Sequence, residues 1–117
     1  MSSLSNHAGL SEERWARFSW DQRILSMGAE ANRCLKDVKA GRTESARSGY
    51  ERILALLELT AGSERGMGRL REITRLKEFV AGLFIAERME VASHEAMMRS
   101  LLQMSPMGLT QIRLLLG

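Results

Sequence analysis

Proline is almost absent from this chain, and that absence is what most constrains its fold. Pro106 is the only proline among 117 residues. In the remaining sequence, apolar residues recur at spacings of three and four, which is typical of helices, and do not alternate as in strands. We therefore predict an all-α fold, an antiparallel bundle of three main helices with a short C-terminal helix. A flexible N-terminal arm over residues 1–10 precedes this single helical domain of residues 11–117.

The first two main helices have clear start and stop signals. Ser11 is a candidate N-cap for an early turn, and Ser19 with Gln22 matches the reciprocal capping box that begins a helix. Gly41 is predicted to end this helix in a left-handed conformation, and Thr43 to begin the next. The apolar stripes predicted to face the core are Ile24, Gly28, Ala31, Leu35 and Val38, followed by Ala46, Tyr50, Ile53, Leu57 and Thr60.

A single long helix is the simplest interpretation of residues 64–104, because no proline interrupts them. Ile73, Leu76 and Val80 share one face, whereas Ile85 and Met89 begin a stripe on the nearly opposite side. The helix is therefore expected either to kink near Gly82 or to bury a different face in its second half.

That second face and the apolar C-terminus suggest association. Ser105-Pro106 is predicted to end the long helix, and a short apolar helix is expected after it. Two opposed apolar faces exceed what a helical hairpin covers, so we predict a non-enzymatic assembly module that forms a homo-oligomer or binds a helical partner. The residues predicted to bind the partner are Ile85, Met89, Ala92, Met97, Leu101, Ile112 and Leu115.

A catalytic alternative depends on Arg88 and His94. The Arg-x5-His spacing resembles the Arg-x4-6-His motif of HEPN domains, which are small helical bundles that include metal-independent, dimeric RNA-cleaving toxins. The resemblance covers seven residues and implies that Arg88 binds phosphate while His94 acts as acid or base. The competing interpretation of His94 is a solvated side chain paired with Glu90 at i and i+4.

A ridge of basic residues is a second candidate site for binding nucleic acid. Cations cluster at the start of the predicted long helix, where they could follow a phosphate backbone. Acidic residues lie among them, however, and no aromatic residue is interleaved to stack on a base, so a solvated, ion-paired face is preferred. The ridge consists of Arg69, Arg71, Arg75 and Lys77.

Composition narrows the remaining possibilities. Cys34 is the only cysteine, so no intramolecular disulfide can form, and the formal charge is only +3. The chain has no signal-peptide pattern and no long apolar run, so we expect a cytoplasmic protein that does not enter a membrane. No cofactor motif or metal-ligand spacing is present, and neither group is predicted. Trp15, Phe18 and Trp20 are expected to pack over one end of the bundle.

Overall fold

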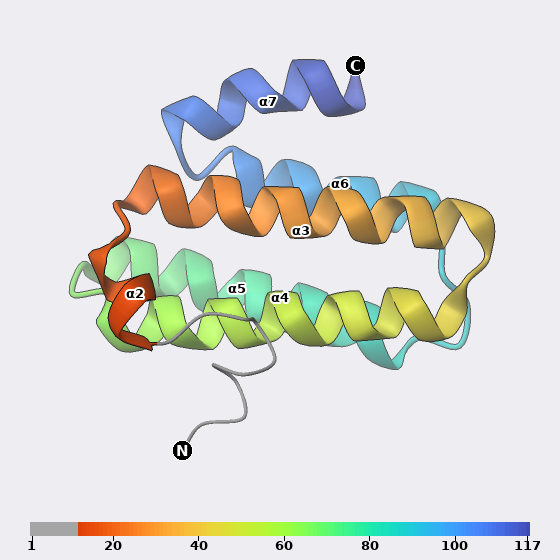
Figure 1. Cartoon of the computed structure of the whole chain (residues 1–117), viewed down its shortest axis with the longest axis horizontal. Helices are drawn as coiled ribbons and strands as arrows, with labels where there is room; N and C mark the ends of the chain where they lie inside the picture. The colour runs from red at the N-terminus through yellow and green to blue at the C-terminus, as the bar shows by residue number, and fades with distance from the viewer. Residues whose placement is uncertain (1–11) are drawn as a thin grey trace.

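The computed structural model describes residues 12–117, which form six helices without any strand between them (Figure 1). The all-α prediction is confirmed, but the helix number is six and not four. The arm over residues 1–10 and the Ser11 cap lie outside the described residues. The helices are α2 (Glu12–Arg17), α3 (Trp20–Ala40), α4 (Thr43–Ser63), α5 (Met67–Ile85), α6 (Val91–Leu102) and α7 (Pro106–Leu116).

Helices α3 to α6 make up the body of the molecule. Each of them packs against two of the others, so that contacts run from α3 to α4, α5, α6 and back to α3. Successive helices run in opposite directions, and the short α2 lies against α4 at one end (Figure 1). The last helix, α7, lies outside this bundle on α3 and α6.

The predicted caps position the first two long helices. The Ser19 hydroxyl accepts from the Gln22 N–H, and the Gln22 side chain accepts in return from the Ser19 N–H, which confirms the capping box. Gly41 has φ 73° and ends α3 in the left-handed conformation that favours glycine. These signals are local, which explains why the sequence alone was sufficient to find them.

The core lies among the four long helices. Every residue of the two stripes predicted for α3 and α4 is buried. At Gly49 the two helices approach closely, since a Cβ built there would lie 2.8 Å from Cys34 Sγ. Burial accordingly raises the pKa of the Cys34 thiol to about 12, so this cysteine is an inert core group.

The predicted long helix over residues 64–104 is wrong. The chain leaves helical conformation after Ile85, turns through residues 86–90 and returns as α6 alongside α5. Gly82 lies inside α5 and causes no break. Because the chain reverses, α6 buries its own set of residues against the same core as α5, namely His94, Met97, Met98, Leu101 and Leu102. Ile85, which begins the predicted second stripe, stays exposed.

Arg47 of α4 stabilises this reversal. Its guanidinium donates to the carbonyl oxygens of Phe84 at 3.3 Å and Ala86 at 3.1 Å. Carbonyls at a helix C-terminus lack intrahelical partners, and a cation there also complements the helix dipole. The end of α5 is thus fixed by a residue far away in the sequence.

Candidate functional site

The predicted partner-binding residues do not form one surface. Met97 and Leu101 are fully buried in the core of the monomer, so they are unavailable to a partner. Ala92 is exposed on α6, Met89 is half-buried in the preceding turn, and Ile85 is exposed at the end of α5. The other two residues, Ile112 and Leu115, are half-buried on α7, where they pack against the core.

Helix α7 is held close to the end of α6 by Gly108. Ser105 caps α7, because its Oγ accepts from the Gly108 N–H at 3.0 Å, and Pro106 occupies the first turn. A Cβ built on Gly108 would lie 2.1 Å from the Leu102 carbonyl oxygen. Only glycine allows this backbone approach, so one residue determines where α7 sits.

Three large apolar side chains of α7 are exposed to solvent. Met107 and Leu109 are each 54% exposed and Leu114 is 72% exposed, which makes three of the five large exposed hydrophobic residues in the described chain. Arg113 is the only charged residue of α7. At about 100° per residue, Met107 and Leu114 lie together on one edge of the helix, and Leu109 lies on the other. The bundle therefore covers only the middle of a broad apolar arc.

A groove adjoins the Met107 and Leu114 edge. It lies between α3 and α7, has a volume of about 320 Å³, and is lined only by uncharged residues. Gln111 is one of them and lies within about 60° of both Met107 and Leu114 around the helix. We call it the α3–α7 groove; its lining residues are Leu25, Gly28, Ala29, Asn32, Leu102, Gln111 and Leu115.

His94 is part of the core and does not join Arg88. The imidazole is fully buried, contrary to the expectation of a solvated side chain paired with Glu90. Its Nε2 donates to the Ala31 carbonyl oxygen at 2.8 Å, which leaves Nδ1 to accept from the Tyr50 hydroxyl at 2.8 Å. Arg88 is exposed in the turn between α5 and α6. His94 thus connects α3, α4 and α6, and both ring nitrogens are occupied within the protein.

Burial of His94 predicts a pH-dependent stability. Desolvation lowers the pKa of His94 below its ordinary 6.5, outweighing the opposing effects of the Ala31 hydrogen bond and the nearby Glu95 charge. The unfolded chain therefore takes up a proton below about pH 6.5 that the native state resists. We expect the free energy of unfolding to be greatest above pH 6.5 and to fall below it by up to about 1.4 kcal/mol per pH unit.

Urea unfolding at pH 7.5, 6.5 and 5.5 measures this effect. Two carboxylates also have lowered pKa values: Glu30, where Arg52 and Arg33 outweigh the effect of burial, and Asp37, which is hydrogen-bonded to Arg42 and Ser45. Their protonation lowers the free energy of unfolding mainly below their ordinary pKa values of 4.5 and 3.8, which lie outside the pH range of this experiment. The His94→Gln variant is the control and should show a flatter profile over the same range. Equal pH profiles for the two proteins would contradict the assignment.

The predicted basic ridge is divided by ion pairs and stacking. Arg69 stacks over the Trp20 ring at 4.4 Å and lies 3.8 Å from Glu64, and Lys77 pairs with Glu58. Arg71 and Arg75 remain exposed on the outer side of α5. No group of three or more His, Cys, Asp or Glu side chains within residues 12–117 is arranged to hold a metal ion.

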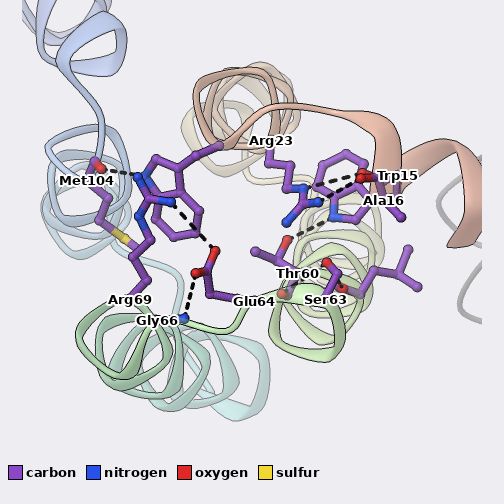
Figure 2. Close-up of polar contacts among 11 residues, drawn as sticks. Trp15, Ala16, Arg23, Thr60, Ser63, Glu64, Gly66, Arg69 and Met104 are labelled. Carbon is purple, nitrogen blue, oxygen red and sulfur yellow. Dashed lines mark hydrogen bonds and ion pairs between the residues drawn. The ribbon is translucent and has the colours of Figure 1, made fainter.

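The aromatic cluster of Trp15, Phe18 and Trp20 packs on the core at one end of the bundle, as expected. Figure 2 shows the polar contacts of Trp15 there. The Trp15 indole donates to the Thr60 hydroxyl at 2.9 Å, and the Trp20 indole donates to the Met104 carbonyl oxygen at 2.7 Å. No sequence pattern indicates the buried Arg23, whose guanidinium donates to the Trp15 and Ala16 carbonyls at the end of α2 (Figure 2). This end is filled by internal contacts.

Comparisons with known proteins give no relative for this chain: no family model, no curated protein and no solved structure matches it. None of the helices between residues 12 and 117 is both long enough and apolar enough to cross a membrane.

Proposed function

We propose that this domain is a non-enzymatic interaction module that binds protein through the exposed side of α7. The observation that carries the proposal is the solvent exposure of Leu114, Met107 and Leu109 on a helix whose opposite side already packs on the bundle. The apolar arc of α7 is wider than the face that packs on the bundle, and contiguous exposed apolar surface is typical of an interaction site. In the isolated domain α7 is covered on one side only.

The surroundings of α7 support a protein partner. Charged residues are depleted at the centres of protein interfaces, and the α3–α7 groove beside Leu114 has no charged lining residue. A groove between two helices is also a common binding site for the apolar face of a partner helix. This surface therefore combines a projecting side chain, Leu114, with an adjacent groove that can receive a side chain of the partner.

The nucleic-acid alternative has weaker support. An acid or base for RNA cleavage must reach its substrate, and His94 is fully buried with both nitrogens hydrogen-bonded. The ridge contains two cations already engaged by acids, Arg69 and Lys77. Protein binding through α7 is therefore the favoured function.

Site-specific photo-crosslinking in cells tests this proposal. A photoreactive amino acid at position 114 should give a discrete protein adduct, because Leu114 would lie inside the interface. Position 85 is the matched control, since Ile85 is 76% exposed and lies away from α7 at the end of α5. Adducts at position 85 but none at position 114 would refute the proposal.

A further inference from the structure

We infer that the partner of α7 is a second copy of this chain, joined in a two-fold dimer in which Leu114 of each copy enters the α3–α7 groove of the other. This inference rests on the proposed function and adds the identity of the partner. Three features of the same surface support it: its shape, its charge and its polar groups.

The shape is complementary to itself. Leu114 projects from one edge of α7, and the α3–α7 groove of about 320 Å³ lies beside that edge. In a two-fold interface the same patch is used by both subunits, so a patch that carries both a projection and a hollow can satisfy both contacts at once. A partner without a matching hollow would leave Leu114 in water.

The helix spacing is compatible with antiparallel pairing of the two α7 helices. Met107 and Leu114 are two turns apart on one edge, so an antiparallel arrangement places Met107 of one copy beside Leu114 of the other. The midpoint between these two positions falls beside Gln111. The two-fold axis would therefore pass close to Gln111 in both copies.

Charge also favours pairing at this surface. The chain carries a formal +3, so two copies repel each other wherever their cations meet. All seven residues that line the α3–α7 groove are uncharged. Arg113 is the one charge of α7, and it lies on the outward strip near Thr110, about 100° around the helix from Leu114 and about 160° from Gln111. The lining of the α3–α7 groove therefore adds no like-charge contact between two copies.

The polar groups of the surface are also able to pair with themselves. The groove contains two amides, Asn32 and Gln111. An amide side chain has both donors and an acceptor, so it can bond to an identical group across a two-fold axis. Gln111 at the axis can thus exchange N–H···O hydrogen bonds with its own copy.

Sedimentation equilibrium of the purified full chain tests the dimer. The wild type should show a concentration-dependent monomer–dimer equilibrium, and Leu114→Glu should raise the dimer Kd at least about thirtyfold, as for a central contact residue. Ile85→Glu is the matched control and should leave Kd unchanged, because Ile85 is equally exposed but distant. Circular dichroism should show both variants folded, since neither side chain is part of the core.

A cysteine at position 111 tests the position of the axis. Gln111→Cys should form an interchain disulfide under mild oxidation, whereas Ile85→Cys should not. The native Cys34 does not interfere, because it is buried and its pKa is raised to about 12. A wild type that stays monomeric at every concentration, or a dimer unaffected by Leu114→Glu, overturns the inference. If position 114 nevertheless crosslinks to a different protein in cells, the proposed function stands and only the dimer is wrong.

Discussion

Replacing His94 with alanine is expected to lower the free energy of unfolding by about 3–5 kcal/mol. The imidazole is fully buried and bridges the Ala31 carbonyl and the Tyr50 hydroxyl. Its removal leaves a cavity between α3, α4 and α6 and leaves the buried Tyr50 hydroxyl without a partner, whereas the Ala31 carbonyl lies inside α3 and keeps its intrahelical hydrogen bond. The unpaired hydroxyl costs about 1–3 kcal/mol, and truncation of a buried side chain of this size adds about 2–3 kcal/mol.

Urea unfolding followed by tryptophan fluorescence provides the measurement. Tyr50→Phe is the matched control, because it removes only the hydroxyl and leaves the ring packed on His94, and it should cost about 1–2 kcal/mol. Glu90→Gln, on the exposed N-cap of α6, should change stability little. If His94→Ala destabilised the protein no more than Glu90→Gln does, His94 would not be the core group described above.

Gly108→Ala is expected to displace α7 from the bundle. The added Cβ would lie 2.1 Å from the Leu102 carbonyl oxygen and 2.9 Å from its carbon, and both are backbone atoms that cannot rotate away. Either α7 moves outward or the turn between α6 and α7 changes conformation. We expect a loss of about 1–3 kcal/mol in unfolding free energy, as for an overpacked core.

Hydrogen exchange locates this effect. Amides of α7 should lose protection in Gly108→Ala while those of α4 and α5 keep theirs, because α7 contacts only α3 and α6 extensively. Gly82→Ala is the control: nothing lies within 4 Å of the added Cβ, so the substitution should raise stability by up to about 1 kcal/mol. Unchanged protection of α7 in Gly108→Ala would show that the close approach is not required.

Local signals in the sequence were enough to predict much of the fold. Ser19 and Gln22 form the predicted cap, Gly41 ends α3, and Ser105-Pro106 lies at the predicted break before the C-terminal helix. Each of these signals acts within a few residues, so no knowledge of the rest of the chain was needed. The buried stripes on α3 and α4 could be predicted for the same reason, because the spacing of apolar residues along a helix defines its core-facing side directly.

The reversal between α5 and α6 could not be predicted in this way. Residues 86–90 contain neither glycine nor proline, and the contacts that end α5 come from Arg47 in α4. The apolar stripe of residues 64–104 changes to the other side of the predicted helix near Gly82. This change alone does not distinguish a chain reversal from a second apolar face that binds a partner. Met97 and Leu101 were consequently assigned to a partner, although they belong to the monomer core.

The candidate surface was predicted only in part. The apolar C-terminus suggested an interaction, yet which side of α7 stays exposed depends on the close contact between Gly108 and Leu102. Leu114 and Met107 are therefore not among the predicted partner-binding residues, although the apolar arc of α7 is wider than one bundle face can cover. His94 was placed on a solvated face because its partner Tyr50 lies 44 residues away in the sequence.

The position of the crosslink in cells tests the central claim most directly. We predict that photoreactive residues at positions 107 and 114, on one edge of α7, give adducts, and that a residue at the equally exposed position 85 gives none. For a dimer of this chain, the adduct should have twice the mass of the monomer. Adducts confined to position 85, or equal adduct formation at all three positions, would contradict the assignment of α7 as the binding surface.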